Sequence, residues 1–585
     1  MRIQALVTAA ATLLVVVNSA TAQDAAKLQD LMDDVWTHQV AIAPLFATRV
    51  GVHDYNSKLD DVSLESQAAH INVERKLLAR LKEISKDNLD LQGTIDWEIV
   101  HRLLDERING YELNAHLMPI TNRSGFHIYF PELPKQMSLS TSAGYENYIA
   151  RLEGFLGYTR QHIELLREAI RQGYTLPAVV LKGYGQTITA HIVEKPEESL
   201  LYSPFVKFPA SIDATAQSQL RTRGTEAIEK SVIAGYREFL EFFNKEYLPA
   251  ARKTIGASDL PNGPAYYLHT IRVYTTMNSS PDSIHAVGVK EVARIQKEMD
   301  ALRQRVKFDG DHKAFIEFLR TDPRFYAKTR EELMQHVALI LKKMDGQLPS
   351  MFRKLPRTPY GLMPIPDYIA PKTSSAYYSE PAGDGSRPGV YYLNTYDLKS
   401  RPLFEMEALS FHEAVPGHHL QIALAQEMTN VHPLRRFTEL NAFVEGWALY
   451  SERLGLEAGF YQDPYSDFGR LSFEMWRACR LVVDTGIHAL GWTRDEAVAF
   501  MGKHTALSPH NIESEVDRYI SWPGQALGYK LGELKIRELR AKAEKKLGDE
   551  FDLREFHDVI LRNGSVPLDV LGDVVEAYLK EKTPQ

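Results

Sequence analysis

One short stretch of this sequence gathers three histidines and a glutamate among apolar residues. Residues 407–421 contain His412, Glu413, His418 and His419. In the common zinc-binding helix, two histidines four positions apart lie about 40° apart around the axis and one turn apart along it, so both imidazoles reach one tetrahedral ion. The spacing here is six or seven positions. A shared metal therefore requires a different local geometry.

An unbroken helix would not bring these histidines together. His418 would lie about 240° round from His412, and His419 would lie more than about 10 Å further along the axis. Pro416 prevents such a helix, because it has no N–H for the carbonyl of residue 412 and its ring clashes with that carbonyl. Gly417 then allows backbone angles that other residues resist. We predict that the helix opens here and that His412 and His418 bind one ion, with His419 as the alternative second ligand.

A site of this kind needs a third protein ligand, and Glu445 is the best candidate. It lies in a helical pattern over residues 441–452 and is surrounded there by apolar residues. A solitary carboxylate is costly in such surroundings unless it is paired or bound to a metal, and the alternative is an ordinary salt bridge. Glu452, two turns later, is predicted to orient a ligand histidine. Three protein ligands leave a position for water, as in catalytic zinc sites, so we expect one Zn²⁺ per chain.

The chemistry expected of such a site is amide hydrolysis without a covalent intermediate. Zinc lowers the pKa of its water from about 15.7 towards 7. Glu413, next to His412 in the sequence, can take the proton and later deliver it to the leaving amine. The developing oxyanion needs a further donor, for which Tyr519, Tyr529 and then His488 are candidates. For each of these three, the alternative is a packed side chain whose polar group is satisfied in the interior.

Two runs typical of strands, residues 375–379 and 389–394, precede the histidines and are separated by glycines and a proline. They predict a β-hairpin. Tyrosine is favoured in strands, so core packing alone would account for its abundance there. The second run leads directly to the histidines, however, and an edge strand beside a catalytic helix can pair with an extended peptide, backbone to backbone.

Residues 1–22 have the three parts of a cleaved secretory signal: Arg2, an uncharged run over residues 5–17, and Ala-Thr-Ala ending at residue 22. The alternative is a membrane anchor, but the run is shorter than the roughly 20 residues that span a bilayer. We expect a secreted or periplasmic protein with no membrane association after cleavage. The only cysteine, Cys479, allows no intrachain disulfide, and no thiol lies near the cleavage point for a lipid.

The overall composition excludes several classes of function. At 44% hydrophobic and 25% charged residues, the 585-residue chain is typical of globular proteins. A net charge of -8 provides no basic footprint for nucleic acid. The chain has neither the Gly-x-Ser-x-Gly elbow of many serine hydrolases nor a phosphate-binding Gly-x-x-x-x-Gly-Lys loop. Composition leaves the oligomeric state open.

Apolar residues recur at helical spacing over long segments, which predicts a mainly α fold with a small β-hairpin beside the metal helix. Examples are residues 97–108, 145–170, 226–243 and 282–302. Prolines and glycines mark candidate joints at residues 259–264 and 355–371. Placing the boundary in the second joint predicts a signal peptide (1–22), a mainly helical N-terminal part (23–360) and a metal-binding catalytic part (361–585). One continuous fold is the alternative.

Four ordered motifs resemble the bacterial family known as domain of unknown function 885, over nearly the whole mature chain. They are His-Glu-Ala-Val-Pro-Gly-His-His-Leu-Gln ending at residue 421, Val-Glu-Gly-Trp-Ala-Leu-Tyr ending at 450, Asp-Thr-Gly-Ile-His ending at 488 and Tyr-Ile-Ser-Trp-Pro-Gly-Gln-Ala-Leu-Gly-Tyr ending at 529. More distantly, their order is similar to that in the helical zinc peptidases, which include angiotensin-converting enzyme, thimet oligopeptidase and the thermostable bacterial carboxypeptidases.

The more distant resemblance implies a large helical body of the zincin type, with a deep groove, zinc on its floor and access for short peptides. The Gly-His pair that closes the metal helix in those enzymes aligns with residues 417–418, and their third ligand aligns with Glu445. The two-residue expansion between the histidines is the departure from their pattern.

The same resemblance implies which residues would contact a substrate. The substrate-binding edge aligns with the strand that holds Tyr391, Tyr392 and Asn394. A carboxypeptidase would also need a cation for the terminal carboxylate, for which Arg518 and Lys530 are candidates. We expect a zinc peptidase acting on short peptides, either a carboxypeptidase or an oligopeptidase. The alternatives are a zinc- or peptide-binding protein without turnover and a metal-dependent hydrolase of other amides or esters.

Overall fold

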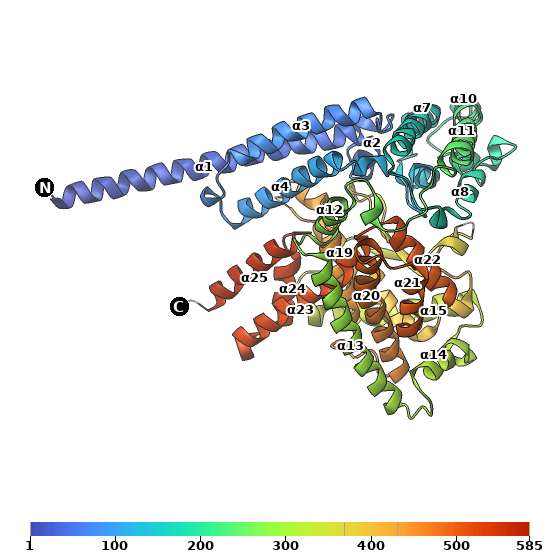
Figure 1. The fold of residues 1–585 in the computed structure, drawn as a ribbon. Coiled ribbons are helices and arrows are strands. Elements are labelled where there is room, and N and C mark those ends of the chain that lie inside the picture. Colours follow the sequence, from blue (N-terminus) through green and yellow to red (C-terminus); the bar gives the residue numbers. More distant parts are fainter. Residues whose placement is uncertain (1, 368, 430, 584–585) are drawn as a thin grey trace.

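The computed structural model describes residues 2–367, 369–429 and 431–583, with the backbone alone for residues 2–20 and 372. The fold of these residues is mainly α (Figure 1). The helices before the sheet are α1 (Arg2–Ile42), α2 (Pro44–Arg49), α3 (Leu64–Lys82), α4 (Leu91–Glu112), α5 (Phe126–Tyr129), α6 (Leu133–Gln136), α7 (Ser142–Gln172), α8 (Gly185–Thr189), α9 (Ser203–Val206), α10 (Ala214–Ala227), α11 (Ala234–Phe242), α12 (Gly263–Thr275), α13 (Pro281–Arg305), α14 (His312–Thr321) and α15 (Arg330–Met351).

The helices after the sheet hold the histidine cluster and most of its surroundings. They are α16 (Met406–Glu413), α17 (His418–Gln426), α18 (Pro433–Phe437), α19 (Asn441–Leu454), α20 (Pro464–Ala489), α21 (Arg494–His504), α22 (Pro509–Ser521), α23 (Gly528–Leu547), α24 (Leu553–Leu561) and α25 (Leu568–Lys582). The helical segments predicted at residues 97–108, 145–170 and 282–302 lie inside α4, α7 and α13, and residues 226–243 span the end of α10, a π-helical turn and α11. The predicted mainly α fold is confirmed.

Helices α1, α3 and α4 pack together at the N-terminal end through a core of their own. Its members include Leu31 of α1, Leu81 of α3 and Leu104 of α4. The predicted signal peptide falls on the first half of α1. Among the described residues, no helix combines the length and the apolarity needed to cross a membrane.

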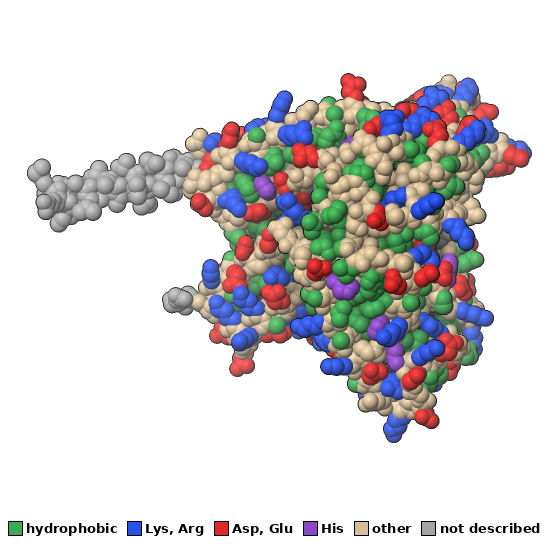
Figure 2. All heavy atoms as spheres, viewed as in Figure 1, with side chains coloured by type: hydrophobic (Ala, Val, Ile, Leu, Met, Phe, Trp, Pro, Cys, Tyr) green, Lys and Arg blue, Asp and Glu red, His purple; other side chains and the backbone are tan. Residues whose placement is uncertain are grey.

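Helix α20 lies in the middle of the C-terminal helices (Figure 1), and its side chains are buried continuously from Phe468 to His488. Helices α19 and α23 cross in close contact because glycines face each other at the crossing. A Cβ on Gly446 would lie 2.5 Å from the Cα of Gly532. The main core includes residues on both sides of position 360, such as Phe155 and Trp447. Figure 2 shows acidic and basic side chains interspersed over the visible face.

A three-stranded sheet precedes the histidine cluster, in the order β1-β3-β2. Strands β2 (Ala376–Ser379) and β3 (Gly389–Leu393) are antiparallel, which confirms the predicted hairpin. Strand β1 (Tyr360–Pro364) pairs with β3 in parallel, inside the proline-rich segment where only a joint was expected. The expectation that β3 is a substrate-binding edge is therefore wrong, because both of its edges are already paired.

Candidate metal centre

Two separate helices, rather than one distorted helix, present the histidines. Helix α16 ends at Glu413 and α17 begins at His418, with a cis peptide bond between Val415 and Pro416 in the connection. A Cβ on Gly417 would lie 2.0 Å from the carbonyl oxygen of His412, so only glycine fits at this close approach. The indole Nε1 of Trp447 in α19 donates to the carbonyl of Pro416 at 2.9 Å. The predicted break thus occurs, and α19 holds it in place.

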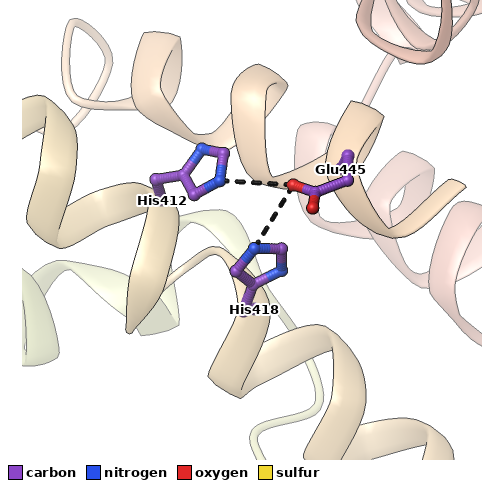
Figure 3. Close-up of side chains that lie close together, drawn as sticks. All are labelled: His412, His418 and Glu445. Atoms are coloured by element: carbon purple, nitrogen blue, oxygen red, sulfur yellow. Dashed lines mark ion pairs between the residues drawn. The ribbon is translucent and has the colours of Figure 1, made fainter. Parts of the chain in front are cut away.

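His412, His418 and Glu445 converge on one point (Figure 3). Oε2 of Glu445 lies 3.4 Å from Nε2 of His412 and 3.5 Å from Nε2 of His418. The ligand atoms of the three residues all lie within 4.8 Å of one another. Atoms bound to a tetrahedral zinc at 2.0–2.2 Å are roughly 3.3–3.6 Å apart, so the two distances to Glu445 already match those of a shared ion.

The donor set fits a divalent metal chemically as well. Oε2 of Glu445 is buried and has no hydrogen-bond partner among the described residues, although two imidazole nitrogens face it. An orphaned buried carboxylate oxygen is costly, and a cation held by all three groups would relieve that cost. The group can therefore hold a metal ion, and imidazole with carboxylate suits zinc among other transition metals.

Glu452 lies behind His412, as the sequence predicted for an orienting residue. Its Oε1 is 2.8 Å from Nδ1 of His412, which directs Nε2 towards Glu445. Glu452 is itself 1% exposed and has Arg477 at 3.6 Å. Burial disfavours the imidazolium, yet Glu445 and Glu452 raise the pKa of His412 to about 9. The same carboxylates that stabilise this proton would stabilise a metal cation in its place.

Glu413 ends α16 next to the first ligand and is 8% exposed. Burial raises the pKa of its carboxyl group, while His412 and His418 oppose that shift. The pKa of Glu445 is instead held well below its usual range, because the two imidazoles outweigh the effect of burial. Neighbouring carboxylates of the centre thus differ in proton affinity, which suits one as a ligand and the other as a base.

His419, the alternative second ligand, points away from this centre. Its Nδ1 lies 2.8 Å from the hydroxyl of Tyr378, and its Nε2 lies 3.1 Å from the carbonyl of Thr358. Burial lowers its pKa to about 4, so the ring is neutral and joins the sheet to α17. The structure therefore places His418, and not His419, beside His412 and Glu445.

Of the three candidate oxyanion donors, Tyr529 is the one that the structure brings to the centre. Its ring lies parallel to that of His412, with 6.3 Å between centroids. Its hydroxyl accepts a hydrogen bond from Nη2 of Arg518 at 3.2 Å. Arg480 also stacks on Tyr529, with its guanidinium carbon 4.2 Å from the ring centroid.

Tyr519 and His488 are engaged elsewhere, so their predicted role as donors is corrected. The Tyr519 hydroxyl accepts from Trp476 at 2.9 Å and donates to Glu515 at 3.0 Å. Nδ1 of His488 accepts from the backbone N–H of Ala257 at 2.9 Å, and its Nε2 donates to the carbonyl of Tyr519 at 2.9 Å. Burial lowers the pKa of His488 to about 3. Both residues tie buried elements together through these hydrogen bonds.

The predicted substrate residues, on β3 and directly after it, mainly make structural contacts. Tyr391 and Asn394 are fully buried. The Asn394 amide donates to three carbonyls of the preceding loop, those of residues 370, 373 and 374. Tyr392 stacks on Tyr377 across the hairpin. Because Lys530 is fully buried between Glu474 and Glu533, it is not available for a substrate carboxylate, whereas Arg518 lies beside Tyr529.

Two arginines of α20 belong to the surroundings of the centre and were not among the predicted site residues. Arg477 and Arg480 are 4% and 2% exposed, and both approach Tyr529. In the sequence they lie in a run where charged residues recur every three or four positions, which is typical of a solvent-facing helix stripe, so no sequence signal marked them.

Comparisons with known proteins place these observations in a family context. The family model described as "Bacterial protein of unknown function (DUF885)" matches residues 44–575. No curated protein matches the chain. A solved structure described as "the putative lipoprotein from Colwellia psychrerythraea" is similar at 30% identity and a TM-score of 0.88, covering 96% of this chain and 100% of that one. A "putative lipoprotein of unknown function from Shewanella oneidensis" shares the fold at 18% identity and a TM-score of 0.66, covering 94% and 99%.

Proposed function

The chain belongs to the DUF885 family of bacterial proteins of unknown function, and from its histidine–glutamate centre we propose that it is a zinc-dependent peptidase acting on short peptides. The observation that carries this proposal is the convergence of His412, His418 and Glu445 with Glu413 beside them. A structural zinc site closes all four positions with protein ligands. Three protein ligands and an adjacent carboxylate are the arrangement of a hydrolytic centre.

Zinc, when bound, would supply a Lewis acid that polarises a carbonyl and acidifies water. The residues of the chain supply the rest. Glu413 accepts a proton from the attacking water and returns it to the leaving amine, for which its raised pKa is suited. Tyr529, held by Arg518, donates its hydroxyl hydrogen to the oxyanion that develops on the substrate carbonyl. Glu452 keeps the His412 ring oriented.

Short peptides are the proposed substrates because the centre is enclosed. His412 and His418 are 3% and 9% exposed, so a folded protein surface would not reach them. An extended chain of a few residues is narrow enough to approach a buried metal.

We also propose that the protein works outside the cytoplasm, after removal of residues 1–22. Both similar structures are described as a "putative lipoprotein", and the one at 30% identity supports a location in the cell envelope. In this chain the only cysteine, Cys479, is buried in α20. We propose a secreted or periplasmic location.

Metal analysis and a peptide library test the proposal directly. The purified chain, loaded with zinc and freed of excess metal, is expected to contain about one zinc and to cleave members of a mixed peptide library, as followed by mass spectrometry. Chelation is expected to abolish cleavage and zinc to restore it. Bound zinc without cleavage of any peptide would favour a binding protein. Cleavage of non-peptide amides or esters in a parallel panel, but of no peptide, would favour a different metal-dependent hydrolase.

A further inference from the structure

A pocket opens along the face of α17 that carries His418. From this helix it is lined by Gln421, Ile422, Ala425 and Gln426, which are three, four, seven and eight positions after His418. Residues at these spacings share one helix face. The pocket therefore begins one turn from a proposed metal ligand and continues away from it.

Two carboxylates form part of the opposite wall. Glu380 follows β2 and is two residues from Tyr378, whose ring centroid lies 6.4 Å from that of His418. Glu439 precedes α19, the helix that carries Glu445. Although Glu439 keeps one side open to solvent, loss of water within the pocket and the nearby Glu380 raise its pKa to about 8. Two carboxyl groups, both able to accept hydrogen bonds, thus lie on one side of the pocket.

A third acceptor lies deeper in the same pocket. Oε1 of Gln421 is buried and has no hydrogen-bond partner among the described residues, in a side chain that is 3% exposed. A buried amide oxygen left without a donor is costly, so its presence points to a donor supplied from outside the chain. This observation is independent of the two carboxylates.

Two arginines also line the pocket and limit its negative charge. Arg49 interacts electrostatically with Glu439 and stacks on Phe46, 5.5 Å from the ring centroid. Arg436 donates from Nε to the carbonyl of Gln426 at 3.0 Å. The pKa of Glu439 stays raised in spite of Arg49, so this carboxyl group keeps its proton at neutral pH, and a cation bound beside it would replace that proton.

We propose that this pocket binds an ammonium group of the substrate, the α-ammonium at the N-terminus of a peptide or the side-chain ammonium of a lysine, through Glu380, Glu439 and Gln421. This inference rests on the proposed peptidase function. Helix α17 rises about 1.5 Å per residue, and an extended peptide about 3.3–3.6 Å per residue, so residues one turn past His418 are about one to two substrate residues from the metal. Cleavage then falls at the first or second bond from a free N-terminus.

Three matched peptides test this specificity on the zinc-loaded full chain. The first has a free N-terminus and no lysine, the second is the same peptide N-acetylated, and the third is N-acetylated with lysine near the N-terminus. We expect release of one or two N-terminal residues from the first, and at least a tenfold rise in KM for the second. A KM for the third peptide close to that of the first would show that a lysine side chain can also supply the ammonium group.

Two variants connect the effect to the pocket. Glu439→Gln and Glu380→Gln are expected to raise KM for the free peptide about tenfold with little change in kcat and in zinc content. Glu331→Gln, an exposed position in the first turn of α15, is the matched control and is expected to behave as wild type. Calorimetric titration of the free and acetylated peptides into zinc-loaded Glu413→Gln measures binding without turnover, and the free peptide is expected to bind more tightly.

Equal cleavage and equal binding of the free and acetylated peptides, or cuts confined to the C-terminal end, would overturn the pocket proposal while leaving the peptidase intact. Failure to cleave any of the three would count against the peptidase itself. In that case tighter binding of the free peptide would still support the pocket, and equal binding would overturn both proposals.

Discussion

Glu413 is the carboxylate of the centre whose surroundings favour its protonated form, because burial raises its pKa while the imidazoles only partly oppose the shift. Glu445, a few ångströms from two imidazoles, is strongly favoured as an anion. The two residues have the same chemistry in water. Their different neighbours assign one to proton transfer and the other to metal binding.

Replacing Glu413 by Gln is expected to lower kcat by about 10²–10⁴ and to leave zinc content unchanged, because glutamine fills the same space but accepts no proton. Steady-state kinetics and metal analysis of the same preparation measure the two quantities. Glu407→Gln in the same helix is the control, since its carboxylate accepts from the backbone of Tyr461. Activity in Glu413→Gln equal to that of the control would remove Glu413 from the proposed chemistry.

Glu452 acts through His412, so its replacement is predicted to affect the metal first. Glu452→Gln is expected to weaken zinc binding about 10–100-fold, the range typical of residues that orient a metal ligand. Competition with a chromophoric chelator measures that affinity. Glu445→Ala should weaken zinc binding further, because it removes a ligand atom. Zinc affinity unchanged in both variants would contradict the assigned site, provided that the thermal unfolding midpoint of each metal-free chain is that of wild type.

At the scale of elements, the connection between α16 and α17 decides whether the two imidazoles meet. The chain leaves one helix at Glu413 and enters the next at His418, and the Trp447 indole holds the intervening Pro416 carbonyl. The close crossing of α19 and α23 at Gly446 positions the adjacent Glu445. The hydrogen bond to Pro416 and the glycine crossing at Gly446 therefore set the relative placement of all three proposed ligands.

Gly417→Ala is expected to separate the histidines, because its Cβ would lie 2.0 Å from the carbonyl oxygen of His412. Overpacking of this kind costs about 1–3 kcal/mol of stability. We expect zinc affinity to fall together with the thermal unfolding midpoint. Gly346→Ala in α15, where a Cβ meets nothing within 4 Å, is the matched control and should keep full affinity. Normal zinc binding by Gly417→Ala would show that the connection tolerates other geometries.

At the scale of the whole molecule, Glu515 joins distant parts of the chain. It forms ion pairs with Arg123, a residue far away in the sequence, at 2.8 Å and with Arg480 of α20 at 3.1 Å. Burial opposes ionisation, but Arg518, Arg123 and Arg480 hold the pKa of Glu515 well below its usual range. A carboxyl group with a lowered pKa in the folded state contributes stability above its unfolded pKa of about 4.3, and that stability is lost as pH falls below this value.

Acid unfolding is therefore expected to depend on Glu515. Each extra proton taken up on unfolding changes stability by about 1.4 kcal/mol per pH unit, so wild-type stability should fall steeply below about pH 4.5. Glu515→Gln should be destabilised by about 3–5 kcal/mol at neutral pH, because it leaves buried arginines unpaired. Its stability should depend less on pH in the acid range. Circular dichroism across a pH series measures how the stability of wild type and of Glu515→Gln changes with pH. Equal slopes of stability against pH in the two proteins would exclude this carboxylate as a source of the pH dependence.

The sequence by itself determined features that depend on local rules. Helical periodicity predicted α4, α7 and α13, and turn residues predicted the β2–β3 hairpin. Pro416 and Gly417 predicted the break between the histidines, because a missing N–H and a missing Cβ act on the chain within a few residues. A buried charge without a sequence neighbour marked Glu445.

Tertiary structure alone decided which side chains face one another. The pairing of β1 with β3 closed the expected substrate edge, and backbone groups from distant segments engaged His488 and Asn394. Arg477, Arg480 and the acidic pocket beside α17 also arise from contacts between remote segments. Such contacts depend on how helices pack and not on local spacing, so no periodicity or turn signal in the sequence encodes them directly.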